Sequence, residues 1–172
     1  MEPILTVPFT AEHYGRLPEG FPAELVEGTF AKLPPPSPDH EAIVRRVAER
    51  FSAAAGERRV PPARAEVWVD DLNVLRPDVA LLDEADDTPD SSGPAIPRLV
   101  VEVLAPPTAD RDRDLKSPIY LRAGVTEVWL VDPDERSIEI RTTAGTRAIN
   151  AAGTATTTLV PGLDIRGTEL FA

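Results

Sequence analysis

The chain has 172 residues, which fits one domain, and its 42% hydrophobic and 27% charged residues are typical of a globular protein. Its 29 acidic residues outnumber its 18 basic ones, giving a formal net charge of -11, so nucleic-acid binding by overall charge is disfavoured and would need a local basic groove. The absence of cysteine excludes disulfides, thiolate zinc sites and a cysteine nucleophile, and two histidines, His13 and His40, leave little for a histidine-rich metal site.

The first third of the chain predicts an arm, a hairpin and a helix. Residues 1–22 contain four prolines and are expected to form an arm that leads into the fold. Residues 24–33 predict a β-hairpin that turns at Gly28. Ser37, followed by a proline, is a typical helix N-cap, and apolar residues then recur at helical spacing until Gly56, where a C-terminal cap belongs.

The middle of the chain predicts strands and a second helix. Three β-type segments are expected, at residues 66–70, 79–82 and 99–104. Between the last two, residues 83–94 are acidic and rich in proline, glycine and serine, which indicates a solvated loop. Residues 110–123 predict a helix that ends at Gly124.

The last part of the chain predicts mainly β structure. The expected elements are strands at 127–131 and 137–141, a turn at 132–134, and from residue 151 a final strand pair with a turn at 161–162. The order of elements favours an α/β fold of the mixed α+β kind, in which helices pack on a mixed sheet between an N-terminal hairpin and a β-rich C-terminal tail. Residues 23–172 would then form a single domain.

Two carboxylates interrupt apolar strands. Glu102 lies within Leu-Val-Val-Glu-Val-Leu, and Asp78 breaks the apolar segment that ends at residue 82. A lone ionised carboxylate in such surroundings costs several kcal/mol unless a cation or hydrogen-bond donors compensate it. A structural ion pair would explain one such residue, but two on successive strands that can pair favour a shared cation. Oxygen ligands without sulfur indicate Mg²⁺ or Mn²⁺.

Lys116 is the third candidate. Only Lys32 and Lys116 are lysines among the 18 basic residues, and Lys116 lies in the charged stretch 110–116 of the second predicted helix. This stretch can be read as a solvated helix start. Alternatively, the ammonium lies over the carboxylate pair, where it could orient or deprotonate a water and neutralise charge on a phosphate.

These residues belong to a larger pattern. In order and spacing, the chain resembles the Uma-two-type endonucleases, bacterial members of the PD-(D/E)XK restriction-endonuclease-like superfamily. The resemblance covers about residues 20–170 and is carried by Glu-Leu-Val-Glu-Gly at 24–28, Ser-Pro-x-His at 37–40, Arg-Pro-Asp-Val at 76–79, Val-Val-Glu-Val-Leu-Ala-Pro at 100–106, Lys-x-x-x-Tyr-x-x-x-Gly-Val-x-Glu-Val-Trp-x-Val-Asp at 116–132 and Leu-x-Pro-Gly-Leu at 159–163.

The resemblance implies a restriction-endonuclease-like core with an N-terminal helix and a curved sheet that carries a metal site. Asp78 matches the first acid of the superfamily and Glu102 the second, so both are expected to be catalytic and to hold the metal. Lys116 matches the family lysine, which has moved from the strand to the following helix. The strand position two after Glu102 is Leu104, so the usual acid-x-Lys on one strand is absent.

The resemblance also points to auxiliary residues. Glu24 matches a family acid and is either an additional ligand or water-positioning group, or an exposed charge at a strand end. His40 matches a family histidine that either contacts substrate or simply lies at the helix terminus. Tyr120 and Trp129 are interpreted as core residues rather than as groups that stack on bases.

The expected function is Mg²⁺-dependent hydrolysis of DNA phosphodiester bonds, with Asp78 and Glu102 on the metal and Lys116 positioning the attacking water. A non-catalytic binding or assembly module on the same fold is the alternative, and the negative net charge favours it. A third reading is an acid-pair hydrolase for another substrate, such as a glycoside. It ranks last because glycosidase acids seldom need an adjacent lysine.

The expected partners follow from charge, hydropathy and the resemblance. The densest basic stretch either contacts the DNA backbone or forms only the polar face of the first helix; it comprises Arg45, Arg46, Arg50, Arg58, Arg59 and Arg64. No apolar run approaches the roughly 20 residues of a membrane span, so we expect a soluble, cytoplasmic protein without membrane contact. The superfamily resemblance implies a homodimer.

Overall fold

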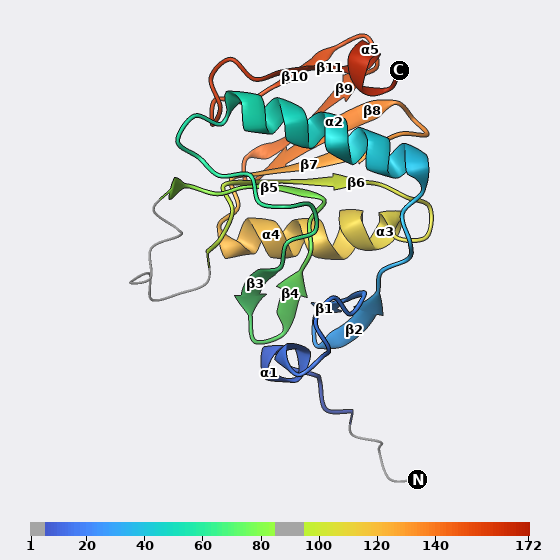
Figure 1. Ribbon diagram of the computed structural model, residues 1–172, viewed down its shortest axis with the longest axis vertical. Helices are drawn as coiled ribbons and strands as arrows, with labels where there is room; N and C mark the ends of the chain where they lie inside the picture. Colours follow the sequence, from blue (N-terminus) through green and yellow to red (C-terminus); the bar gives the residue numbers. More distant parts are fainter. Residues whose placement is uncertain (1–5, 85–94) are drawn as a thin grey trace.

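Helices cover both faces of a five-stranded mixed sheet in the computed structural model, which describes residues 6–84 and 95–172 (Figure 1). The strand order is β5-β6-β7-β8-β9, and the bounds are Val79–Leu81, Leu99–Val103, Glu127–Asp132, Ser137–Thr142 and Gly145–Asn150. The β6–β7 pair is parallel, and the other neighbouring pairs are antiparallel. Because parallel strands need a crossover connection, the chain between β6 and β7 forms the helices of one face.

A second, smaller sheet combines the N-terminal hairpin with two further strands. Its order is β2-β1-β4-β3, with bounds Thr29–Lys32, Ala23–Val26, Asn73–Leu75 and Val67–Asp70. The predicted turn at Gly28 is confirmed, and this glycine has a φ of +74°, which a residue without Cβ adopts freely. Helix α1 (Ala11–Gly15) lies beside this sheet and buries Tyr14. The sequence did not predict this helix within the segment interpreted as an arm.

Helix α2 (Pro38–Ala54) covers one face of the large sheet, as predicted. The Ser37 side chain accepts a hydrogen bond from the backbone N–H of His40, which satisfies one of the free donors at the helix start. Its apolar stripe includes Val47 and Phe51, and Phe51 contacts Trp129 of β7 edge to face at a centroid distance of 5.6 Å. Trp129 is therefore a core residue, as expected.

The other face carries a helical segment with an irregular centre. It consists of α3 (Ala109–Arg111), the π-helical turn η2 (Asp112–Lys116) and α4 (Ser117–Ala123). The predicted helix 110–123 is confirmed, including its end at left-handed Gly124, but the sequence did not predict the π-helical turn. Ile119 and Tyr120 of α4 are buried against Val100 and Val128 of the sheet.

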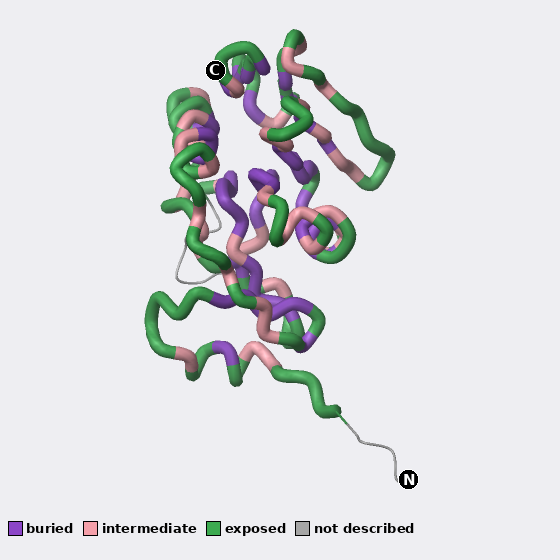
Figure 2. Tube along the Cα trace, turned by 90° about the vertical axis from the view of Figure 1, so that its right-hand side faces the viewer, coloured by how far each residue is buried: buried purple, intermediate pink, exposed green. Residues whose placement is uncertain are grey.

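The C-terminal tail closes the core on the α2 side. Strands β10 (Thr154–Thr156) and β11 (Asp164–Arg166) form the predicted antiparallel pair, and helix α5 (Gly167–Leu170) follows them. Figure 2 shows that buried segments run through the centre of the molecule, whereas residues 6–9, the first that the structure describes, are exposed.

Several elements were not predicted: β4, β9 and α5 as well as α1. Strand β9 is largely exposed and has no apolar alternation, so only its pairing with β8 defines it. Most of the predicted solvated loop, residues 85–94, lies outside the described residues. The mixed α/β class, with an N-terminal hairpin and a β-rich tail, is confirmed. No helix among residues 6–84 and 95–172 is long and apolar enough to cross a membrane.

Candidate active site

Glu102 lies on the face of the sheet that η2 and α4 cover, and Asp78 directly precedes β5. The antiparallel register pairs Val79 with Val101, so continuing it by one residue brings Asp78 opposite Glu102. Both side chains are buried. The two acids thus come from β6 and from the residue before β5, the strand that pairs with β6.

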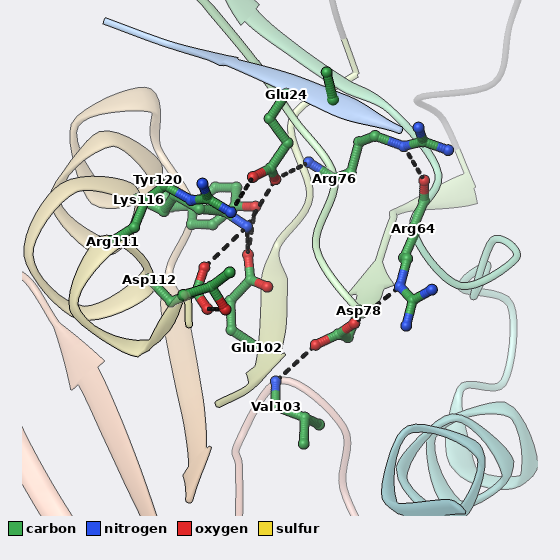
Figure 3. Close-up of polar contacts among 12 residues, drawn as sticks. Glu24, Arg64, Arg76, Asp78, Glu102, Val103, Arg111, Asp112, Lys116 and Tyr120 are labelled. Carbon is green, nitrogen blue, oxygen red and sulfur yellow. Dashed lines mark hydrogen bonds and ion pairs between the residues drawn. The ribbon is translucent and has the colours of Figure 1, made fainter. Parts of the chain in front are cut away.

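Asp78 is oriented by three donors. Its Oδ2 accepts the backbone N–H of Val103 at 2.8 Å and lies 3.3 Å from His40 Nε2, and its Oδ1 lies 3.4 Å from Arg64 Nε (Figure 3). The Val103 contact comes from β6 and ties the segment before β5 to that strand. These contacts fix the direction of the carboxylate.

Glu102 uses one oxygen for protein contacts. Its Oε1 lies 2.7 Å from Lys116 Nζ and accepts the Tyr120 hydroxyl at 2.8 Å. Its Oε2 has no hydrogen-bond partner among the described residues, and in Figure 3 it points away from Lys116, toward the side on which Asp78 lies. Burial raises the pKa of Glu102 well above its usual range; Lys116 opposes this rise, and the neighbouring carboxylates of Asp112, Asp78 and Glu24 add to it.

Lys116 is the centre of a buried charge network, with only 2% of its side chain exposed. Its ammonium lies 2.7 Å from both Glu24 Oε1 and Glu102 Oε1 and 3.3 Å from Asp112 Oδ1. Burial lowers the pKa of Lys116, but the three carboxylates outweigh burial and raise it well above its ordinary value. The group is therefore a charged donor that can orient a water or a phosphate, and it is not placed to deprotonate a water.

Lys116 is expected over both acids, but the structure places it beside only one of them. The ammonium contacts Glu102, and no contact between Lys116 and Asp78 is present in the described part of the chain. Its three N–H donors all face carboxylates, so positioning a water requires that one be released. The contact to Asp112 is the longest of the three and would be the first to give way.

Glu24 is fully buried, so its reading as an exposed charge at a strand end is wrong. Its Oε1 accepts the backbone N–H of Arg76 at 2.7 Å in addition to contacting Lys116. Its Oε2 is buried, accepts no hydrogen bond from residues 6–84 or 95–172, and lies 3.9 Å from Arg111 Nη2. Strand β1 thus delivers an acid to the site from the small sheet.

His40 lies in the first turn of α2, as the sequence indicated, and its ring reaches Asp78. Its Nε2 is 2.9 Å from the carbonyl oxygen of Val103, and its buried Nδ1 has no hydrogen-bond partner in the part of the chain that the structure describes. Burial lowers the pKa of His40, but the hydrogen bond and the charge of Asp78 outweigh burial and raise it. His40 therefore lies at the start of α2 and also contacts Asp78, the predicted metal ligand.

The sequence missed Asp112 and the polar role of Tyr120. Asp112 is buried, accepts the Thr108 hydroxyl at 3.1 Å and contacts Lys116. The alternating charges of residues 110–116 are compatible with a solvated helix start, but the structure buries Asp112 and Lys116. Their spacing of four residues was the available signal. Tyr120 is a core residue, as expected, but its hydroxyl also orients Glu102.

A cavity of about 240 Å³ opens over these groups. Asp78, Glu102, Asp112 and Lys116 line its acidic part, and proline-containing segments 34–36 and 105–107 form other parts of its wall. Within the described residues, no three His, Asp or Glu side chains converge as a ready metal-ligand group. Mg²⁺ commonly keeps several waters and uses one or two carboxylates, so the free Oε2 of Glu102 and the neighbouring Asp78 fit such an ion.

Comparison with known proteins identifies the fold and the family of the chain. No curated protein is significantly similar to the chain. The crystal structure of a putative nuclease belonging to DUF820 from Anabaena variabilis, at 1.96 Å resolution, has the same fold, with a TM-score of 0.83 and 20% sequence identity over 95% of this chain and 98% of that one. A family model described as putative restriction endonuclease (Uma2) matches residues 11–169. The chain therefore belongs to the Uma2 putative restriction endonuclease family, the family that its motifs resemble.

Proposed function

We propose that this protein is a Mg²⁺- or Mn²⁺-dependent endonuclease that hydrolyses phosphodiester bonds of DNA. Family membership supports nuclease activity. The observation that carries the proposal is that Asp78, which directly precedes β5, and Glu102 of the paired strand β6 line one cavity, where Glu102 Oε2 has no hydrogen-bond partner among the described residues. Burying two carboxylates in one cavity costs free energy unless a cation compensates their negative charge.

The metal would be held by Asp78 and Glu102. When bound there, it supplies a Lewis acid for a phosphate oxygen and lowers the pKa of a bound water. The protein's own part is orientation: the Val103 N–H fixes Asp78, while Lys116 and Tyr120 fix Glu102 through Oε1. Lys116 also supplies positive charge near the position where a phosphate would gain negative charge.

The charge balance around Lys116 supports a bound cation. Three carboxylates, from Glu24, Glu102 and Asp112, surround one ammonium. Burial raises the pKa of Glu102 and the neighbouring carboxylates add to this rise against the effect of Lys116, so the site without a cation favours a proton on this group. A divalent ion would remove that need and hold the carboxylates ionised.

A non-catalytic binding module is the second candidate, because all three donors of Lys116 already face carboxylates and the net charge is -11. A closed network of this kind would also serve to join the two sheets. A homodimer stays part of the proposal on the strength of the superfamily resemblance, and light scattering of the purified protein would test it.

The experiment is cleavage of plasmid, single-stranded and branched DNA with Mg²⁺, Mn²⁺ or EDTA. Asp78→Ala, Glu102→Ala and Lys116→Ala are compared with wild type, and Asp110→Ala, an exposed acid next to the site, is the control. We expect metal-dependent cutting that both site-acid variants lose and the control retains. Cutting that persists in EDTA would contradict the proposal, because it would show that cleavage needs no metal.

Calorimetry with Mn²⁺ resolves a negative cleavage result. Binding that disappears in Asp78→Ala and Glu102→Ala would support the metal site and indicate that the DNA target is missing from the substrates. No Mn²⁺ binding by the wild-type protein would overturn the enzyme proposal and leave the binding module.

A further inference from the structure

Arg64 has an unusual backbone next to the candidate active site. Its φ is +61°, in the left-handed region that residues with a Cβ rarely adopt. Among the described residues other than glycine, only Glu27 and Arg136 share a positive φ. Glu27 belongs to the β1–β2 turn, and Arg136 directly precedes β8. Arg64 is the one that lines the cavity over Asp78 and Glu102.

The segment that supplies Asp78 also imposes this conformation. The Arg64 N–H donates to the carbonyl oxygen of Pro77 at 3.1 Å, and the Arg64 carbonyl accepts Arg76 Nε at 3.0 Å. The backbone N–H of Arg76 is in turn bound by Glu24. Strained conformations persist where the surrounding structure fixes them in this way, and they are concentrated at functional sites.

The Arg64 guanidinium has donors to spare. Its Nε faces Asp78 Oδ1 at 3.4 Å, and its two terminal nitrogens make no hydrogen bond or ion pair with any residue of 6–84 or 95–172. In Figure 3 these nitrogens point away from the carboxylate. The side chain is 28% exposed, so the terminal nitrogens can meet a ligand that enters the cavity.

Other arginines of the predicted basic stretch are engaged elsewhere or lie away from the cavity. Arg46 donates to the carbonyl oxygen of Leu170, Arg50 pairs with Glu169, and Arg58 pairs with Asp83. Arg45 is exposed on α2, and neither it nor Arg59 lines this cavity. The structure thus separates Arg64 from a stretch that the sequence could treat only as a group.

We propose that Arg64 is a substrate-binding residue whose terminal nitrogens bind a backbone phosphate of the DNA strand that enters the cavity. This inference rests on the proposed function. A guanidinium presents a planar pair of donors that matches a phosphate, and Asp78 orients it through Nε while leaving that pair free. The strained backbone has a function on this view, since it directs the guanidinium into the cavity.

Arg64→Gly tests the proposal because glycine adopts a φ of +61° without strain, so the variant loses the guanidinium while the backbone conformation is kept. Arg136→Gly is the matched control, since it removes the same charge from another left-handed arginine outside this cavity. Fluorescence anisotropy is measured with labelled single-stranded and duplex 20-mers, with Ca²⁺ in place of Mg²⁺, and thermal melting checks the fold.

We expect Arg64→Gly to raise Kd by at least about 10-fold and to lower the slope of log K against log salt concentration by about one. Arg136→Gly should stay within about 2-fold of wild type, and Arg64→Lys should fall between the two because it keeps the charge and loses the planar pair. If Arg64→Gly fails to fold, Arg64→Asn makes the same comparison, since asparagine also tolerates the left-handed region.

Unchanged binding by a folded Arg64→Gly would overturn the inference and leave Arg64 as a counter-ion of Asp78. An equal loss in Arg64→Gly and Arg136→Gly would overturn it too, because the effect would then be one of overall charge. If the wild-type protein binds none of the DNA probes at low salt and cleaves none, the proposed function fails and takes this inference with it.

Discussion

The carboxylate of Glu24 lies 2.7 Å from the ammonium of Lys116 and joins the two sheets of the molecule at the candidate active site. Glu24 belongs to β1 of the small sheet, and Lys116 belongs to the crossover between β6 and β7 of the large one. Both side chains are buried, so each lowers the cost of burying the charge of the other. The polar residues of the candidate site therefore also hold the small sheet against the large one.

Removing the cation should destabilise the fold in a pH-dependent manner. Lys116→Met leaves Glu24, Glu102 and Asp112 buried without their cation, and we expect a loss of about 3–5 kcal/mol at pH 7. Because burial raises the pKa of Glu102 and of Asp112, protonation removes the uncompensated charge as pH falls, and the loss should shrink toward pH 4. Urea unfolding at both pH values measures this.

Lys32→Met is the control for that experiment, since Lys32 is exposed and is the other lysine of the chain. It should unfold like the wild type at both pH values. A Lys116→Met loss that is the same at pH 4 and pH 7 would contradict the assignment of raised carboxyl pKa values.

Glu102→Gln should separate stability from activity. Burial raises the pKa of Glu102, so its ionised form costs the native state stability at pH values above that raised pKa, while below about pH 4 both folded and unfolded chains hold the proton. Glutamine keeps an acceptor for Lys116 and Tyr120 without the charge. The variant should be more stable than wild type at pH 8, equal near pH 4, and at least about 10²-fold slower in DNA cleavage.

Chemical unfolding across this pH range, paired with the plasmid assay, checks both parts. A Gln variant that is less stable than wild type at pH 8 would show that the Lys116–Glu102 ion pair outweighs the cost of burial. Cleavage at the wild-type rate would remove Glu102 from the site.

Asp132 should stabilise the fold at neutral pH. Burial would raise its pKa, but the backbone N–H groups of Glu135 and Asp134 and the guanidinium of Arg113 outweigh burial and lower it. A lowered pKa gives stability that is present above the unfolded value of about 3.9 and is lost as pH falls through the folded value. Asp132→Asn should therefore cost about 1–3 kcal/mol at pH 7 and progressively less in more acid solution.

Urea denaturation at pH 7 and at pH 3 measures the difference. Asp134→Asn, an exposed residue of the same turn, should change stability by less than about 0.5 kcal/mol. An Asp132→Asn deficit that grows on acidification would reverse the assigned direction of the pKa.

Two glycines with positive φ should differ in their tolerance of alanine. A Cβ on Gly124 (φ +104°) would meet no atom within 4 Å, so Gly124→Ala should cost only the backbone strain of about 1 kcal/mol. A Cβ on Gly28 (φ +74°) would lie 2.5 Å from Pro8 Cβ, so Gly28→Ala should cost about 1–3 kcal/mol more. Thermal unfolding ranks the two, and equal melting temperatures would mean that the segment around Pro8 moves aside.

Local signals predicted the elements that frame the site. Gly28 and Gly124 adopt left-handed backbone conformations, and Ser37 caps a helix with its own side chain. Such local features predict a turn, a helix end and a helix start directly from the sequence. Asp78 and Glu102 stand out because each interrupts an apolar segment, and both line the same cavity.

The partners of these residues could not be predicted in the same way. Glu24 reaches Lys116 only because the small sheet packs beside the crossover, which is a tertiary relationship without a local signal. Arg64 looked like one of several surface arginines, and its left-handed backbone arises from hydrogen bonds to Arg76 and Pro77. Asp112 was hidden in a stretch of alternating charge that is typical of a solvated helix.

Because Asp112–Lys116 forms a π-helical turn, the site depends on the number of residues in this stretch more than on the identity of its exposed residues. A π turn accommodates one more residue than an α turn, so removing one residue would leave a regular α-helix through 109–123. Each residue of an α-helix advances about 100° around the axis. A single-residue deletion here would therefore turn either Asp112 or Tyr120 away from the carboxylates, whereas many substitutions at the exposed positions of the same stretch would leave the site intact.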